Sequence, residues 1–217
     1  MSILPPMARD GSLVSEHPEV GARLGPASAA QRARLLDAVA RVVADKGYLA
    51  CTVADIVRAA GVSRSTFYEL FEGKEACFLE AYRHGVDVLV ERVRLAVREA
   101  DPDDWRAQLR AGIGAWLETL RAEPGFARTY LLEIAAAGPA ARQARADALV
   151  RFAERYRATA AKAGHRPSLD VLLIVCAGGE QLAAERVRTG AASELMTLVD
   201  PVYACVEAVI ESADPAS

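Results

Sequence analysis

The sequence is poor in cysteine and lysine and contains no asparagine. Its four cysteines, at positions 51, 77, 176 and 205, include no C-x-x-C pair, so a disulfide framework is not predicted and reduced thiols are expected. Only three residues are lysine, against 23 arginines. This skew is typical of GC-rich coding sequence, although arginine also suits bidentate contacts to carboxylates, phosphates and guanine edges.

Long apolar runs are absent as well. No uncharged stretch reaches the roughly 18 apolar residues of a membrane-spanning helix. The first residues, MSILPPMARD, do not combine a positive segment with an apolar one, so no signal peptide is expected. We therefore predict a cytoplasmic protein without a membrane partner.

Neither sign of charge predominates strongly. The formal net charge is −3, from 26 basic and 29 acidic residues. This balance excludes a nucleic-acid binder that is strongly basic along its whole length, but it leaves room for a local basic surface.

The residues that are present favour helices. Hydrophobic residues make up 52% of the chain, which is enough to form a core and excludes global disorder. Alanine, the best helix former, occurs 44 times and outnumbers every residue type that favours strands. The predicted fold class is all-α.

Helical periodicity divides the chain into an arm, two domains and a tail. Residues 1–27 are punctuated by proline and glycine and are expected to be a disordered arm. Nine helices are predicted after it, over residues 28–46, 53–60, 64–71, 74–100, 105–122, 126–137, 139–163, 168–189 and 193–211. The first three form a predicted domain of residues 28–75. The other six belong to a helical domain of residues 76–212, followed by a disordered tail, 213–217.

The most specific stretch runs from Thr52 to Phe78, TVADIVRAAGVSRSTFYELFEGKEACF. Two short helices, each preceded by a good N-cap residue, meet at a tight turn around Gly61, which supplies the backbone freedom that the turn needs. This is the pattern of a helix-turn-helix, whose second helix lies in the major groove of DNA. A small core is expected from Ile56, Val62, Phe67 and Phe71.

The start of the second helix holds the candidate DNA contacts. Arg64 can pair with guanine, and Thr66 can hydrogen-bond a base or contact a thymine methyl group. Ser65 is small enough for close backbone approach, while hydroxyls, a lysine and helix N-terminal N–H groups suit phosphates. The candidate DNA-binding residues are Thr52, Ser63, Arg64, Ser65, Thr66, Phe67, Tyr68 and Lys74. The segment from Ser28 to His84 contains eight basic and seven acidic residues, so its net positive charge is small. The prediction of DNA binding therefore rests on the motif.

At these residues the chain resembles the N-terminal DNA-binding region of the TetR family of transcription regulators. The resemblance covers about Gln31 to Tyr82 and rests on the spacing A-G-V-S-x-x-T-F-Y-x-x-F-x-x-K-E. It implies that residues 63–67 belong to the recognition helix and that Tyr68 and Lys74 contact phosphates. One position departs from the family, because many members carry histidine where this chain has Leu70, which cannot donate to a phosphate. Glu69 would repel phosphate unless it points away.

The resemblance implies an all-α homodimer that represses genes and leaves its DNA when a small molecule binds the C-terminal domain. We therefore predict a ligand-responsive repressor on a pseudo-palindromic double-stranded operator. Residues 168–189 and 193–211 carry apolar surface beyond one face, which suits a dimer interface. The alternative is a helical interaction protein, or an activator, that keeps the fold without ligand-released repression.

Aromatic residues at helical spacing in the second domain have two interpretations. Most such residues belong to a core, yet they can also line a ligand pocket, and an acid among them could meet a cationic ligand. The candidate pocket residues are Trp116, Phe126, Tyr130, Glu133, Phe152 and Tyr156. Gly112 and Gly114 would leave room for a ligand beside Trp116. Gly178 and Gly179, inside an apolar helix, indicate close packing or a kink.

Enzyme motifs are missing. The three histidines, at 17, 84 and 165, follow no Glu-x-x-His pattern, and no zincin, P-loop, nucleophile-elbow or dinucleotide-binding motif is present. No catalytic residue, metal site or cofactor is therefore predicted.

Overall fold

A computed structural model describes residues 25–213. The predicted arm, 1–27, lies outside these residues except for its last three, and the predicted tail, 213–217, except for its first. The described residues form nine α-helices and two 3-10 segments with no β-strand, which confirms the all-α prediction. The α-helices are α1 Pro26–Lys46, α2 Val53–Ala60, α3 Arg64–Leu70, α4 Lys74–Glu99, α5 Trp105–Ala122, α6 Pro124–Leu131, α7 Pro139–Lys162, α8 Leu169–Arg188 and α9 Val199–Glu211.

The first helix begins two residues earlier than predicted. Pro26 occupies its first turn, where the fixed φ of proline suits a helix and the missing N–H needs no partner. The helix ends as expected before Gly47, whose φ of +83° lies in the left-handed region. The prediction placed this helix from residue 28 because proline was taken only as a breaker.

Two predicted helices are divided in the structure. The predicted helix over 126–137 consists of α6 and a 3-10 segment, η2, Glu133–Ala136. The one predicted over 193–211 consists of a 3-10 segment, η3, Ala192–Leu198, followed by α9. Pro124 was expected to end the preceding helix, but it opens α6 after the single residue Glu123, again as a proline in a first turn.

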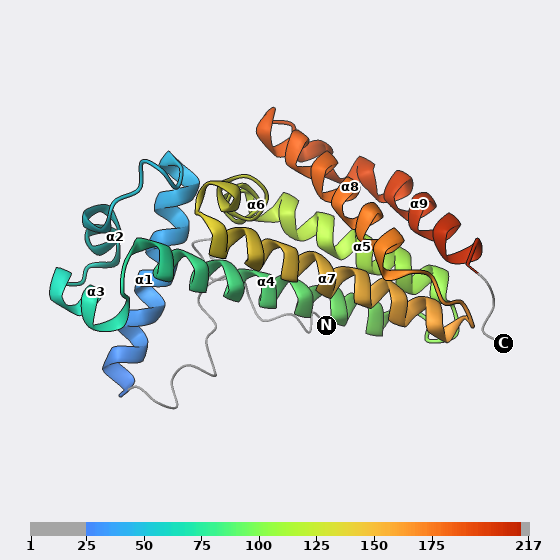
Figure 1. The fold of residues 1–217 in the computed structure, drawn as a ribbon, viewed down its shortest axis with the longest axis horizontal. Coiled ribbons are helices and arrows are strands. Elements are labelled where there is room, and N and C mark those ends of the chain that lie inside the picture. The colour runs from blue at the N-terminus through green and yellow to red at the C-terminus, as the bar shows by residue number, and fades with distance from the viewer. Residues whose placement is uncertain (1–24, 214–217) are drawn as a thin grey trace.

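The helices form an elongated molecule (Figure 1). Helices α1, α2 and α3 lie together at one end, and α4 runs from this end along α5 and α7. Helices α8 and α9 lie on one side of that bundle and pack against each other. Both α9 and the preceding segment η3 contact α5. Because α4 begins beside α3 and continues into the bundle, the predicted domain boundary at residue 75 falls in its first turn.

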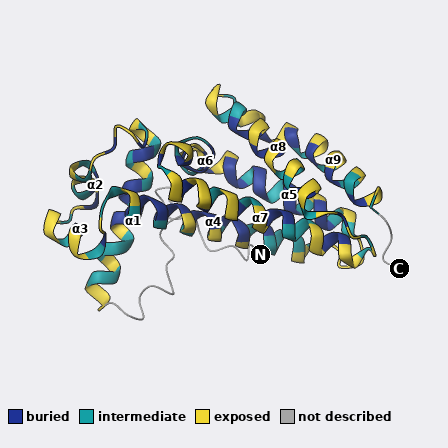
Figure 2. Cartoon of the chain, in the orientation of Figure 1, coloured by how far each residue is buried: buried dark blue, intermediate teal, exposed yellow. Residues whose placement is uncertain are grey.

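The core is continuous along the molecule (Figure 2). The predicted inner face of α4 is confirmed, since Phe78, Tyr82, Val86, Leu89 and Val93 are all buried. The same buried cluster includes residues of α1 and α3 at one end and of α9 at the other. None of the helices described between residues 25 and 213 combines the length and apolarity that a bilayer crossing requires.

Candidate functional site

The turn between α2 and α3 has the geometry that its sequence predicts. Gly61 adopts φ +62°, ψ +41°, a left-handed conformation that glycine tolerates without a side-chain clash. Thr52 caps α2 in a capping box, because its hydroxyl accepts from the Asp55 N–H while the Asp55 carboxylate accepts from the Thr52 N–H at 3.0 Å. Hydrogen bonds from Lys46 and Thr52 hold the pKa of Asp55 well below its usual range.

Helix α3 turns a polar face to solvent. Arg64, Ser65 and Tyr68 are exposed, and the Tyr68 side chain is 50% exposed in spite of its aromatic ring. The Arg64 guanidinium lies 5.7 Å from the centre of the Tyr68 ring and donates to its hydroxyl at 3.4 Å. A cation and a phenol are thus presented together, one helical turn apart, on the outer face of a short helix.

Three hydroxyls gather at the start of α3. The Ser63 Oγ accepts from the Thr66 N–H at 3.0 Å and so caps the helix as predicted. The same oxygen lies 2.7 Å from the Ser65 Oγ and 2.8 Å from the Thr66 Oγ1. These groups, with the free N–H groups of the first turn, form a polar edge of the kind that accepts phosphate or base edges.

Phe67 does not belong to this exposed face. Its side chain is fully buried, so the prediction that it contacts DNA is corrected. The ring packs with Phe71, at 5.8 Å between ring centres, and meets the edge of Tyr68 at 5.4 Å. Phe67 therefore anchors α3 from below, while its neighbours carry the exposed chemistry.

Lys74 is held by the backbone beside the turn. Its ammonium donates to the carbonyl oxygens of Tyr48 at 2.8 Å and Cys51 at 2.9 Å, and lies 4.2 Å from the centre of the Tyr48 ring. These contacts fix the loop before α2 to the start of α4. The Lys74 ammonium has three N–H donors, and two of them already bind protein carbonyls. The predicted phosphate contact would therefore use the third.

Leu70, which departs from the family pattern, packs at the junction of three helices. The Leu70 side chain is half-buried against the core, and its carbonyl oxygen accepts from Arg32 at 3.0 Å. Arg32 also pairs with Glu80 and lies over the Phe71 ring at 4.4 Å, so it joins α1, α3 and α4. Glu69 is exposed next to Tyr68.

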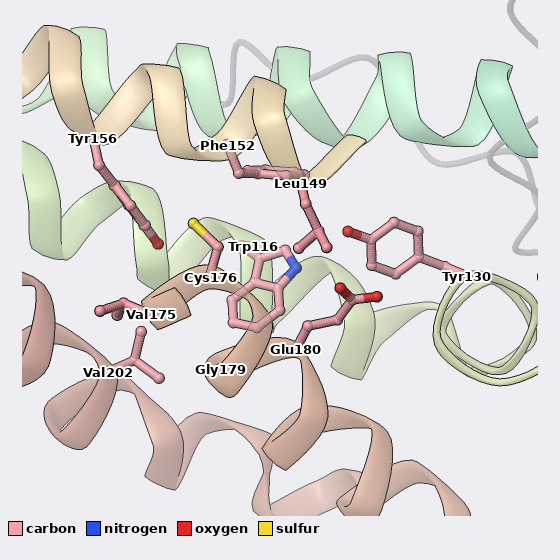
Figure 3. A pocket seen from close by; sticks show the side chains of 10 residues that line it. All are labelled: Trp116, Tyr130, Leu149, Phe152, Tyr156, Val175, Cys176, Gly179, Glu180 and Val202. Carbon is pink, nitrogen blue, oxygen red and sulfur yellow. The ribbon is translucent and has the colours of Figure 1, made fainter. Parts of the chain in front are cut away.

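A small cavity lies in the helical bundle (Figure 3). Four of the six predicted pocket residues line it, namely Trp116, Tyr130, Phe152 and Tyr156. The remaining lining residues, which were not predicted, are Leu149, Val175, Cys176, Gly179, Glu180 and Val202. The lining draws on α5, α6, α7, α8 and α9, so these helices together form a mainly apolar cavity.

The other two predicted pocket residues do not line this cavity. The Phe126 ring stacks on Tyr130, at 5.5 Å between centres, and fills the space beside Gly85, where an added Cβ would lie 2.5 Å from it. Glu133 points toward the end of α1, where its Oε2 accepts from the Tyr48 N–H at 2.9 Å. Helical spacing placed both on the face of Tyr130. Phe126 turns to Gly85 instead, and Glu133 lies beyond Leu132, where the chain leaves the α-helix.

The two glycines of α5 do not open the cavity either. Gly112 lies against α4, where an added Cβ would come within 3.1 Å of the Val97 side chain. Gly114 has no heavy atom of the described residues within 4 Å of such a Cβ. The glycine that does line the cavity is Gly179, which packs beside Val202 and Trp116.

Glu180 places an acid in this cavity. It is 1% exposed, and its Oε1 accepts from the Arg145 Nε at 2.9 Å. Burial raises the pKa of Glu180, against the opposing effect of Arg145. Glu180 was not predicted as a pocket residue, although an acid directly after Gly178 and Gly179 in an apolar helix could have indicated it. The described residues hold no cluster of three or more metal-binding side chains.

Residues 35–81 match the family model described as bacterial regulatory proteins, tetR family. The helix-turn-helix end of the chain thus matches the TetR family. The chain is 36% identical over 88 residues to the transcriptional activator FasR of Mycolicibacterium smegmatis, covering 41% of this chain and 39% of FasR. It is 34% identical over 104 residues to the transcriptional repressor KstR2 of Rhodococcus jostii, covering 48% of this chain and 50% of KstR2. The chain thus spans about half the length, or less, of these curated relatives.

Solved structures match the fold of the chain over most of its length. The fatty acid degradation regulator FadR of Bacillus halodurans aligns with a TM-score of 0.72 at 20% identity, over 85% of this chain and 96% of that one. At this identity the likeness shows the fold alone. The two curated relatives are described as transcription regulators, which agrees with the prediction of a DNA-binding regulator.

Proposed function

We propose that this TetR-family regulator binds a pseudo-palindromic DNA operator as a homodimer and represses transcription until a small molecule releases it. The observation that carries the DNA-binding part is the outer face of α3, where Arg64, Ser65 and Tyr68 are exposed above a buried anchor. A helix presented in this way enters the major groove with its first residues at base edges. Because the relatives include both an activator and a repressor, repression rests on the resemblance alone.

The homodimer part is supported by an exposed apolar strip on α8. Val171, Ile174 and Leu182 are 41%, 71% and 46% exposed, although each is a large apolar residue. They recur at helical spacing on one side of α8, which lies beside α9 at the edge of the bundle (Figure 1). Apolar surface of this kind is typical of an interface between subunits.

The small-molecule part is supported by the cavity. A solved fold neighbour, FadR of Bacillus subtilis, is described as a complex with stearoyl-CoA; it aligns with a TM-score of 0.55 at 19% identity, over 82% of this chain and 95% of that one. The cavity of the present protein is small and lined by aromatic residues, which favours a compact effector over a ligand with a long acyl chain.

A chain of contacts connects the cavity with the DNA-binding end. Tyr130 lines the cavity from α6, and three residues later Glu133 pairs with Arg128 at 3.3 Å and accepts from the Tyr48 N–H. Lys74 then holds the Tyr48 and Cys51 carbonyls just before α2. A ligand that displaces Tyr130 would disturb this link, and binding to one conformation shifts the population toward it.

The experiment that tests the function is a binding titration of the purified chain against its own upstream DNA and a random duplex at several salt concentrations. We expect tight binding to the upstream DNA, a strong salt dependence and a large ratio of specific to random affinity. If upstream binding is equal to random binding, a selection from genomic fragments tests for an operator elsewhere. Failure of that selection would refute the function.

The link through Glu133 makes a separate prediction. In Glu133→Gln, the Tyr48 N–H loses a charged acceptor, and hydrogen bonds to charged groups contribute about 1.5–3 kcal/mol. We expect amide hydrogen exchange at Tyr48 to accelerate about tenfold or more, measured by NMR. Glu118→Gln is the control, because Glu118 forms an exposed ion pair with Arg121 on its own helix, α5. Unchanged exchange at Tyr48 would contradict the link.

A further inference from the structure

The polar end of the cavity contains an acceptor that the protein leaves unused. Glu180 is almost fully buried, and its Oε1 is occupied by Arg145. Among the described residues, its Oε2 and the buried Tyr82 hydroxyl have no hydrogen-bond partner. A buried carboxylate oxygen without a partner is costly, so a group that donates to it would be bound favourably.

Three polar groups converge on this end of the cavity. Figure 3 shows the Glu180 carboxylate, the Tyr130 hydroxyl and the Trp116 indole nitrogen facing the same space. The Tyr130 ring stacks on Tyr82 at 5.9 Å between centres, so the second phenol lies just behind the first. The opposite end is closed by Tyr156, Val175 and Val202 (Figure 3). The cavity therefore has its carboxylate at one end, while the other end is apolar apart from the Tyr156 hydroxyl.

The charge at the polar end is already balanced. Arg145 faces Glu180 as an ion pair, and the other groups around the carboxylate, Tyr82, Tyr130 and Cys176, have pKa values raised by burial and stay neutral at pH 7. A ligand carboxylate would meet the charge of Glu180, and a ligand cation would leave a surplus positive charge in a buried place. A neutral donor meets neither penalty.

We propose that the cavity binds a compact, neutral, mainly apolar ligand whose hydroxyl donates a hydrogen bond to the Oε2 of Glu180. Its apolar part lies among Trp116, Phe152 and Tyr156. This proposal rests on the proposed function, since it names the class of the small molecule that the regulator would sense.

Three probes of equal chain length separate the charge classes: 1-octanol, octylamine and octanoate. At pH 7 the amine is an ammonium and the acid a carboxylate, so only the head group differs. The chain has two tryptophans, Trp105 and Trp116. Trp105→Phe therefore leaves Trp116, in the cavity wall, as the single indole reporter. We expect 1-octanol to change its fluorescence saturably and to bind at least about tenfold more tightly than either charged probe.

Glu180→Gln reverses this preference. It leaves Arg145 without its counter-ion, so octanoate should gain about tenfold or more and overtake 1-octanol. Glu185→Gln, five residues along α8 in an ion pair with Arg188, is the matched control and should keep the original order. Tightest binding of octylamine to the unsubstituted cavity, or an unchanged order in Glu180→Gln, would overturn the proposal.

A second variant tests the site if Glu180→Gln does not fold. In Gly179→Ala the added methyl group would lie 3.5 Å from Val202 and 3.9 Å from Trp116, inside the cavity wall. It should weaken 1-octanol binding several-fold. Gly114→Ala, which meets no described atom, is the control for the gain in helix propensity. Equal 1-octanol affinity in both variants would place the probe elsewhere and refute the site.

The outcomes for the ligand and for DNA are distinguishable, because the probes are titrated without DNA. Operator binding with no preference for 1-octanol would refute the ligand class and leave the regulator. A clear preference for 1-octanol in a chain that binds no operator would support the ligand class and refute the DNA-binding function.

Discussion

Phe67→Ala is expected to lower the free energy of unfolding by about 3–5 kcal/mol, the range for truncating a buried phenylalanine. The Phe67 ring is fully buried and contacts Phe71, so its loss leaves a cavity under α3. Helix α3 has only 7 residues and, like other helices this short, depends on tertiary packing. Domains are stable by about 5–15 kcal/mol in total, so the variant loses a large part of its stability.

Urea unfolding of the full chain, followed by circular dichroism, measures this loss. Tyr68→Phe is the control on the same helix, because it removes only an exposed hydroxyl and should change stability by less than about 0.5 kcal/mol. If Phe67→Ala unfolded at the same urea concentration as the unsubstituted chain, the buried anchor assigned to α3 would be wrong.

Arg64→Ala is expected to reduce the preference for the operator over a random duplex by about 5- to 150-fold. This corresponds to the roughly 1–3 kcal/mol of one bidentate base contact. Arg64 is exposed at the first position of α3, and within the described chain its guanidinium reaches only the Tyr68 hydroxyl, at a long 3.4 Å. It is therefore available to turn toward a base edge.

Competition between operator and random duplexes, at two or more salt concentrations, measures that preference. Tyr68→Phe is the matched comparison, because loss of a phosphate contact weakens binding about equally on all sequences. Equal losses on both duplexes for Arg64→Ala would contradict base reading and place Arg64 at a phosphate instead.

The helix-turn-helix could be predicted because its determinants act locally. The caps at Thr52 and Ser63 bind N–H groups three residues ahead, and Gly61 acts through its own φ angle. The sequence around each residue therefore contains its own partner. Phe67 shows the limit of this reasoning, since the sequence placed it both in the small core and among the DNA contacts, and the structure buries it.

The cavity could be predicted only in part because its lining is assembled from distant segments. Helical spacing found the aromatic residues of α5, α6 and α7, but it continued the α6 pattern past Leu132 to Glu133. The chain changes there to a 3-10 segment, so Glu133 turns to Tyr48. The acid that does reach the cavity, Glu180, depends on how α8 packs against Tyr130 and Trp116, which no periodicity specifies.

The unbroken length of α4 has a geometrical consequence. Its 26 residues rise about 1.5 Å each, so the helix is about 39 Å long and begins beside α3. A tilt of about 5° at its far end would displace the near end by about 3 Å, which is close to the roughly 3.4 Å step between base pairs. A two-fold operator requires the two recognition helices to stay one helical turn of DNA apart. In the proposed dimer, such a tilt would therefore move each recognition helix out of register with its operator by about one base pair.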